Sequence, residues 1–167
     1  MDFALTSEQQ HVRDAFARFV VAVVAPRAPG VDDADAHPRA LVRSPADLGF
    51  FGMRYPEDAG GLGLDLSTFC LALAEIARGS MSLAGCAAMQ ALMGTKFLQL
   101  LGNADILGRL FKPALAGEKI GAICMTEPNA GSDLDSIATM ATKVDGGYVI
   151  NGQKTWITSA PVADFFT

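Results

Sequence analysis

Positive charge is scarce in this sequence, and its scarcity excludes one class of function at the outset. The chain carries 13 Lys and Arg against 18 Asp and Glu, a formal net charge of −5 at pH 7. A protein that binds nucleic acid needs a basic stripe to neutralise phosphates, and no such stripe is present. Half of the residues are hydrophobic and only 19% are charged, which indicates a folded domain and not a disordered chain.

Cysteine and histidine are also rare, so neither a disulfide framework nor a metal centre is expected. The three cysteines, Cys70, Cys86 and Cys124, lie in apolar runs and share no metal-ligand spacing. We therefore predict buried free thiols in a reducing compartment, and we place the chain in the cytoplasm. The two histidines, His11 and His37, fall on a predicted helix and in an acidic loop, and we assign them no chemistry.

Long uninterrupted apolar runs are missing, which disfavours a membrane span. Residues 20–25 are apolar but too short for the core of a signal peptide. Residues 81–101 are mostly apolar, yet Gln90, Lys96 and Gln99 interrupt them. A helix that is apolar on most sides can be buried in protein as well as in lipid, and we predict the protein environment.

Helical spacing of apolar residues dominates the first two thirds of the chain. The pattern predicts helices over residues 7–23, 39–48, 65–78, 81–101 and 103–115. Thr6 stands where a capping residue would begin the first helix, and Asn103 where one would begin the last. Pro and Gly after residue 25 should end the first helix, and an exposed acidic loop should follow at 32–35. Residues 55–63 should form an irregular loop.

The composition changes near Gly117, and the remaining residues have β character. Strands are predicted over residues 119–125, 138–144, 147–151, 153–158 and 163–167. The Asn151-Gly152 pair between two of these runs predicts a β-hairpin. We therefore predict an α+β fold: an all-helical domain over residues 1–117 and the beginning of an antiparallel β-domain over residues 118–167.

A polar loop, Thr126-Glu127-Pro128-Asn129-Ala130-Gly131-Ser132-Asp133, directly follows the first predicted strand. Its glycine permits a close approach of the backbone. Two hydroxyls and the loop amides suit a pyrophosphate or the polar edge of a flat heterocycle. Taken alone, the motif is equally typical of an ordinary exit from a strand.

The second candidate segment is Lys154-Thr155-Trp156-Ile157-Thr158. On a strand, Trp156 and Thr158 would project from the same face and present an indole beside a hydroxyl. An indole can pack on an isoalloxazine ring while the hydroxyl bonds its polar edge. A core tryptophan beside a satisfied threonine is the commoner role of this pattern, so the segment alone does not decide.

Four stretches together resemble the acyl-CoA dehydrogenase family in order and in spacing. They are residues 55–63 (YPEDAGGLG), 117–122 (GEKIGA), 125–133 (MTEPNAGSD) and 147–158 (GYVINGQKTWIT). The resemblance covers essentially the whole chain. It implies a helical N-terminal domain, a middle β-domain and a C-terminal four-helix domain, with FAD bound between the last two and between subunits.

The resemblance also implies roles for individual residues. A first segment would line the flavin, with Thr126 on its pyrimidine edge, through Ile123, Cys124, Met125, Thr126, Gly131 and Ser132. A second segment would do so, with Thr158 near N5, through Trp156, Ile157 and Thr158. Ser132 is expected to contact the FAD pyrophosphate, the acyl-CoA pantetheine arm, or both.

The implied chemistry is an α,β-dehydrogenation of an acyl-CoA thioester, in which a carboxylate removes the α proton while the β hydride passes to the flavin. The family's catalytic glutamate belongs to the C-terminal domain, so no residue here is assigned as a catalytic base, and Glu127 belongs to the flavin loop. We expect a second chain or a further C-terminal region to carry the four-helix domain. A homo- or hetero-oligomer is expected, with electron-transfer flavoprotein as a possible acceptor.

Two alternatives remain open from the sequence. A flavin-dependent oxidase or monooxygenase of the same fold would share both loops. A truncated, non-catalytic binding subunit of a heteromer would retain the fold without the reaction.

The sequence also departs from the family at Ser159, where an Asn usually follows the Trp-Ile-Thr run. Acyl chain length is left undetermined, with the central helix near residues 90–95 expected to contribute to the floor of the pocket.

Overall fold

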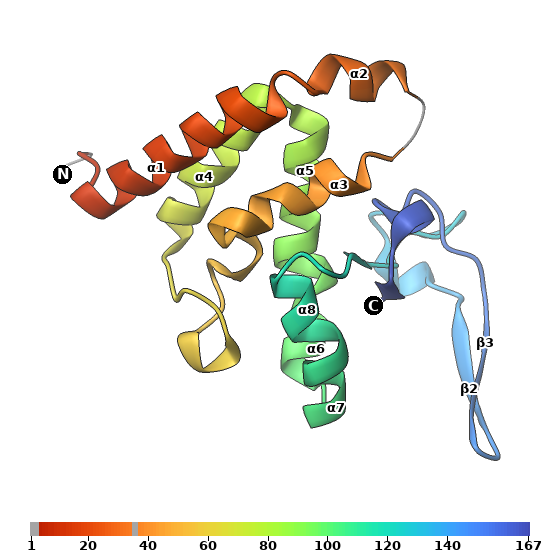
Figure 1. Cartoon of the computed structure of the whole chain (residues 1–167). Helices are drawn as coiled ribbons and strands as arrows, with labels where there is room; N and C mark the ends of the chain where they lie inside the picture. The colour runs from red at the N-terminus through yellow and green to blue at the C-terminus, as the bar shows by residue number, and fades with distance from the viewer. Residues whose placement is uncertain (1–3, 35–36) are drawn as a thin grey trace.

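Helices occupy most of the chain up to residue 115 in the computed structural model, which describes residues 4–34 and 37–167 (Figure 1). They are α1 (Ser7–Phe19), α2 (Ala28–Asp33), α3 (Arg39–Arg43), α4 (Leu66–Gly79), α5 (Met81–Met89), α6 (Lys96–Leu101), α7 (Ala104–Ile106) and α8 (Lys112–Leu115). π-helical turns extend or join several of them, at Val20–Val24, Gln90–Gly94 and Leu107–Phe111. The helices predicted over 7–23, 65–78, 81–101 and 103–115 are confirmed, the last two as shorter pieces in series.

Side-chain caps begin these helices where the sequence placed them. Thr6 Oγ1 accepts a hydrogen bond from the Gln9 N–H at 3.2 Å, and Gln9 Oε1 accepts one from the Thr6 N–H at 3.1 Å. This reciprocal arrangement is a capping box, which satisfies two backbone donors that the first turn leaves unpaired. Asn103 Oδ1 accepts from the Ile106 N–H at 3.0 Å and begins α7 in the same way.

The predicted end of the first helix is confirmed, because a turn at residues 25–27 separates Val24 from α2, but the acidic loop predicted at 32–35 is wrong for residues 32 and 33. Helix α2 includes Pro29 and Gly30, and the acidic pair at 32–33 closes it. Pro29 lies in the first turn, where its missing N–H is not needed and its fixed φ favours the helix. Residue 35, the last of the predicted loop, lies outside the described residues.

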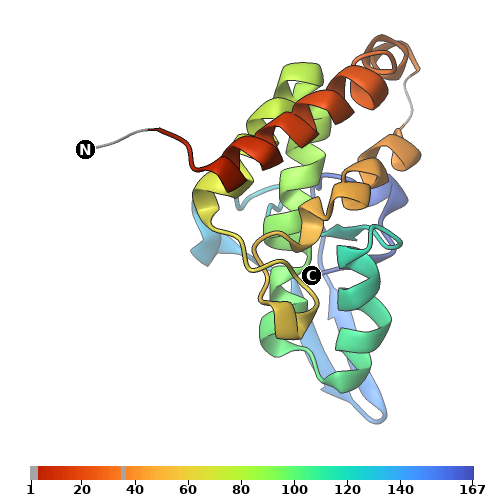
Figure 2. The same ribbon diagram turned by 60° about the vertical axis from the view of Figure 1, so that its left-hand side comes forward.

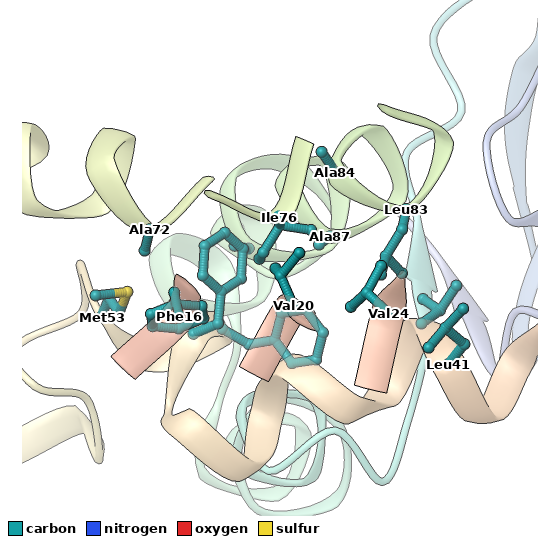
Figure 3. Close-up of a cluster of buried hydrophobic side chains, with 14 of the residues drawn as sticks. Phe16, Val20, Val24, Leu41, Met53, Ala72, Ile76, Leu83, Ala84 and Ala87 are labelled. Carbon is teal, nitrogen blue, oxygen red and sulfur yellow. The ribbon is translucent and has the colours of Figure 1, made fainter. Parts of the chain in front are cut away.

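The core lies where α1, α4 and α5 meet, as Figure 3 shows for one cluster of side chains. Phe16 packs edge-on against Phe50 with ring centroids 5.7 Å apart, and Phe50 stacks on Phe69 at 4.9 Å. All three rings are essentially inaccessible to solvent. Burying a side chain of this size stabilises the fold by about 1.5–3 kcal/mol, so aromatic contacts across the bundle hold the helical domain together.

Strands β2 (Met140–Val144) and β3 (Gly147–Asn151) form an antiparallel hairpin. The turn is Asp145-Gly146, in which Gly146 has a φ of 77°. A two-residue turn of this kind requires a left-handed backbone that glycine adopts without steric cost. The hairpin predicted at Asn151-Gly152 is therefore wrong, and residues 153–158 do not form a strand. In Figures 1 and 2 the hairpin projects away from α1.

The second strand pair is parallel, not antiparallel as predicted. β1 (Gly121–Ala122) pairs with β4 (Phe165–Phe166), so the run predicted as a strand over 119–125 is much shorter. The strand predicted at 163–167 is confirmed. The long excursion between the two strands carries the hairpin and both candidate loops, and its return beside β1 is what makes the pair parallel.

Two polar side chains attach this β region to the helices. Arg39 of α3 donates to the Asp164 carboxylate at 2.6 Å and to the Val162 carbonyl. Asp164 Oδ2 also accepts from the Ile120 N–H at 2.7 Å. Burial raises the pKa of Asp164, but the Ile120 N–H and the Arg39 guanidinium lower it by more, so the net pKa lies below its usual range. The ionised carboxylate thus joins α3, β1 and the residues before β4.

A close backbone contact joins β1 to the central helix, which is α5 continued by the π-helical turn Gln90–Gly94. This contact yields a testable prediction. A Cβ added at Gly94 would lie 2.8 Å from the Gly121 carbonyl oxygen, whereas one at Gly108 would meet nothing within 4 Å. We expect Gly94→Ala to lower the free energy of unfolding by about 1–3 kcal/mol, since overpacking forces the backbone apart. Gly108→Ala, measured by urea unfolding beside it, should be neutral or slightly stabilising. Equal stability of the two variants would contradict the contact.

The described part of the chain contains no helix that is both long and apolar enough to cross a membrane. Within the same residues, no three His, Cys, Asp or Glu side chains gather as a metal site would require. The three cysteines are free, but the predicted burial is wrong: Cys86 and Cys124 are partly exposed, and Cys70 is exposed. Cys70 lies on the solvent side of α4, whose opposite side carries Phe69 and Ala72 into the core.

Candidate functional site

The first candidate loop begins at Thr126, a short distance after β1 ends at Ala122. Glu127 and Ala130 exchange two backbone hydrogen bonds, from the Glu127 N–H at 2.8 Å and from the Ala130 N–H at 3.2 Å. These bonds close a tight turn whose exposed corner is Pro128-Asn129. Gly131 and Ser132 follow it at the surface, and both line the same cavity as Thr126.

The second candidate segment lies beside the first but is not a strand. The Thr155 N–H donates to the Thr126 carbonyl at 3.0 Å, which joins the two segments directly. Trp156 then adopts a φ of 57° and is 89% exposed. A left-handed backbone is rare for a bulky residue and costs free energy, and such strain is concentrated at functional sites. The alternation argument for Trp156 and Thr158 does not apply, because a turn and not a strand orients them.

The two segments nevertheless enclose one cavity of about 300 Å³. Eight of the nine predicted cofactor residues line it: Ile123, Met125, Thr126, Gly131, Ser132, Trp156, Ile157 and Thr158. Sequence reasoning missed three further lining residues, Met89, Met93 and Leu134. Met89 and Met93 are four residues apart on the central helix and so share a face, but that spacing is also typical of an ordinary core contact.

Cys124 is the predicted residue that does not line this cavity. It faces a second cavity of about 430 Å³, whose lining is almost entirely apolar and includes Phe97, Leu101 and Ile106. Burial raises the pKa of the Cys124 thiol, and the nearby charge of Lys154 only partly opposes this. The thiol is therefore protonated at neutral pH. Any contact of Cys124 with a ligand in the first cavity would have to come through its backbone.

Donors around the first cavity are left without protein partners. Among the described residues, no acceptor is bound by the backbone N–H groups of Thr126, Ser132, Ile157 and Thr158. The hydroxyls of Thr126, Ser132 and Thr158 likewise have no partner in the described chain. Polar groups gathered at the wall of a largely apolar cavity are typical of a site that recognises a small molecule.

Glu127 and Lys154 form a mostly buried ion pair behind the cavity. The Lys154 ammonium lies 2.8 Å from Glu127 Oε1, with side-chain exposures of 21% and 7%. The Glu127 carboxylate also accepts from the N–H groups of Ala138 at 2.8 Å and Thr139 at 3.0 Å. Lys154 first, and then Thr139 and Ala138, lower the pKa of Glu127 to about 2. A carboxylate that stays ionised and fully engaged is a poor proton acceptor, so Glu127 is not a catalytic base.

The lowered pKa of Glu127 predicts an acid-sensitive contribution to stability. Because the folded-state pKa lies below the ordinary value of 4.5, the contribution is complete above that pH and is lost as pH falls toward about 2. Unfolding free energies measured between pH 6 and pH 2.5 should therefore fall more steeply for the wild type than for Glu127→Gln. Glu118→Gln, which changes an exposed carboxylate, should keep the wild-type slope. Parallel profiles for wild type and Glu127→Gln would contradict the prediction.

Comparison with known proteins identifies this arrangement. Residues 6–118 match the family described as acyl-CoA dehydrogenase, N-terminal domain, and residues 122–167 match acyl-CoA dehydrogenase, middle domain. The chain belongs to the acyl-CoA dehydrogenase family. The resemblance inferred from the four sequence stretches is therefore confirmed, and so is the α+β class, because solved structures of this family superpose on nearly the whole chain.

Individual relatives and solved structures are similar to all or nearly all of the chain. Benzylmalonyl-CoA dehydrogenase from Aromatoleum aromaticum is 75% identical over all 167 residues, which make up 44% of that protein. The structure of a glutaryl-CoA dehydrogenase in complex with glutaryl-CoA has a TM-score of 0.91 at 32% identity, covering 99% of this chain and 43% of its own. An FAD complex of PigA has a TM-score of 0.90 at 27% identity, covering 99% and 44%. The chain thus spans less than half the length of these relatives.

Proposed function

We propose that this protein carries out FAD-dependent α,β-dehydrogenation of an acyl-CoA thioester, and that this chain supplies one wall of the flavin and substrate site. The observation that carries the proposal is the single cavity between residues 123–134 and 156–158. Its wall holds hydrogen-bond donors without protein partners and the exposed Trp156, whose backbone is strained. Family membership and the FAD complex of a structural relative support the same cofactor.

The residues around the cavity fit FAD on their own chemistry. A flat ring system needs an aromatic or apolar surface for its face and donors for its edge, and the cavity wall offers both. Trp156 is 89% exposed beside the cavity, so its indole is free to pack against a ring. Thr126 and Thr158 would hold the polar edge through their free N–H and hydroxyl groups. Ser132 would contact the pyrophosphate, the pantetheine arm, or both.

The groups that line the cavity indicate which part of the reaction this chain would perform. When bound, FAD accepts the hydride that leaves the β carbon of the thioester. This chain would orient the cofactor, and its N–H donors would stabilise negative charge that develops at the ring edge. No carboxylate among the described residues lines the cavity, and Glu127 is ionised and fully bonded. The group that removes the α proton would therefore lie outside the described residues.

An aryl-substituted acyl-CoA is the substrate class that we propose. The support is the 75% identity to benzylmalonyl-CoA dehydrogenase together with the apolar wall of Met89, Met93 and Leu134. Methionine side chains are flexible and polarisable and make favourable contacts between sulfur and aromatic rings. Met89 and Met93 lie on the central helix, where the sequence predicted a contribution to the floor of the pocket, although Gln90 and Thr95 themselves do not line the cavity.

Reduction of the bound flavin by its substrate tests the proposal. The purified intact protein should be yellow, and anaerobic addition of an aryl-substituted acyl-CoA should bleach its flavin absorbance. A straight-chain acyl-CoA of similar length is the control and should bleach it more slowly. An intact protein that retains no flavin would contradict the function. Rapid reoxidation of the reduced flavin by oxygen would instead favour the oxidase or monooxygenase alternative.

The wider assembly is also a proposal. We infer a domain boundary between residues 117 and 118, a four-helix domain supplied by a further region or a second chain, and a homo- or hetero-oligomer. The hairpin supports a covering partner because large apolar side chains on it are more than half exposed, namely Met140, Tyr148 and Ile150. An electron-transfer flavoprotein as acceptor and a cytoplasmic location complete the proposal.

A further inference from the structure

The ion pair behind the cavity touches both of its walls. Lys154 Nζ lies 2.8 Å from Glu127 Oε1 and donates to the Met125 carbonyl at 3.2 Å. Lys154 therefore contacts the residues on either side of Thr126. The Thr126 carbonyl itself accepts the N–H of Thr155, the residue after Lys154. Three contacts in succession thus join residues 125–127 to residues 154–155, immediately before Trp156.

The carboxylate of Glu127 extends this connection to a third segment. Its two oxygens accept from the N–H groups of Ala138 and Thr139, which lead into β2. A Cβ added at Gly152 would lie 2.1 Å from Thr139 Oγ1, so the backbone that leaves β3 also packs against this point. The entry to the hairpin, through the Ala138 and Thr139 N–H groups, and the chain that leaves it, through Lys154, are therefore both bonded to the Glu127 carboxylate.

We infer that Lys154 and Glu127 are positioning residues, whose bridge sets the distance between the Thr126 and Trp156 walls of the cavity. This inference rests on the proposed function, since it assigns the bridge a role in holding FAD. The pair is largely buried, so solvent does not screen it as it does an ion pair at the surface. No other side chain among the described residues bonds to both segments.

The bridge matters because few other contacts hold the two walls of the cavity together. Residues 153–158 have no strand ladder, and the Thr155 N–H bond is their one backbone hydrogen bond to residues 123–132 in the described chain. Trp156 is held at a φ of 57°, a conformation that persists only when its surroundings determine it. If Lys154 no longer reached Met125 and Glu127, Trp156 would relax and the two walls would separate.

Flavin binding by variants of the intact protein tests the inference. Lys154→Met keeps the length of the side chain but cannot donate, and we expect it to raise the FAD dissociation constant at least 10-fold and to shift the absorbance spectrum of the bound flavin. Lys154→Arg can still bridge both acceptors and should restore affinity to within about threefold. Lys143→Met removes a lysine from the exposed face of β2 and is the matched control, expected to match the wild type.

A double variant keeps the test decisive if Lys154→Met is poorly folded because it strands a buried carboxylate. Glu127→Gln with Lys154→Met removes both charges, so it should fold better than Lys154→Met while its FAD affinity remains low. Wild-type affinity and spectrum in Lys154→Met or in the double variant would overturn the inference and leave the proposed function intact. An affinity loss in Lys154→Arg as large as in Lys154→Met would also overturn it. A wild-type protein without FAD affinity would overturn both.

Discussion

Replacing Gln90 with Met should lower the free energy of unfolding by about 3–5 kcal/mol, the largest effect on stability that we expect from one polar substitution in this chain. Gln90 is 2% exposed. Its Nε2 donates to the carbonyls of Ala114 at 3.2 Å and Lys119 at 2.9 Å, and its Oε1 accepts from the Gly121 N–H at 2.8 Å. Methionine has a similar volume but leaves the Lys119 carbonyl and the Gly121 N–H unsatisfied, each at a cost of about 1–3 kcal/mol. The Ala114 carbonyl keeps the hydrogen bond that it accepts from the Gly117 N–H at 3.2 Å.

Urea unfolding, monitored by far-ultraviolet circular dichroism, measures this effect. Gln99→Met on α6 is the matched control: it removes one exposed hydrogen bond, with Lys96 at 2.8 Å, and should change stability by less than about 0.5 kcal/mol. Because Gln90 joins the central helix to β1, the cavity should also lose shape in Gln90→Met. A variant as stable as the Gln99→Met control would show that the Lys119 carbonyl and the Gly121 N–H find other partners.

Replacing Trp156 with Gly should weaken FAD binding by about 10- to 100-fold while leaving the unliganded protein at least as stable as the wild type. At 89% exposure, Trp156 contributes little packing to the described chain, so its removal costs little. Its φ of 57° suits glycine, and relief of this strain should stabilise the unliganded fold by about 1 kcal/mol. A side chain that costs stability where it stands and lines a cavity is best explained by a ligand that covers it.

Fluorescence titration with FAD and thermal unfolding of the apoprotein measure the two halves of this prediction. Trp156→Ala removes the ring but keeps the strain, so its affinity should fall as far as that of Trp156→Gly without the gain in stability. Trp156→Phe retains an aromatic face and should bind FAD with intermediate affinity. If all three variants bound FAD as tightly as the wild type, the indole would have no part in the flavin site.

Local signals in the sequence were sufficient for most of the helical domain. Caps such as Thr6 and Asn103 act within a few residues, and the apolar period of a helix is itself a local property. The failures came where distant contacts decided the outcome. Residues 153–158 have strand composition, but Gly152 packs against Thr139 and Lys154 is drawn to Glu127, so the chain turns there and leaves the ladder.

The amino-acid sequence by itself determined the family, the helices and the two segments that form the candidate site. Motif order and helical periodicity can both be read from residues that are near one another in the sequence. Only the tertiary structure decided which side chains meet. It assigned Met89, Met93 and Leu134 to the cavity, turned Cys124 toward a different one, and paired Glu127 with Lys154. The physical reason is that a cavity and a buried ion pair depend on groups brought together across tens of residues, and no local pattern specifies their distance.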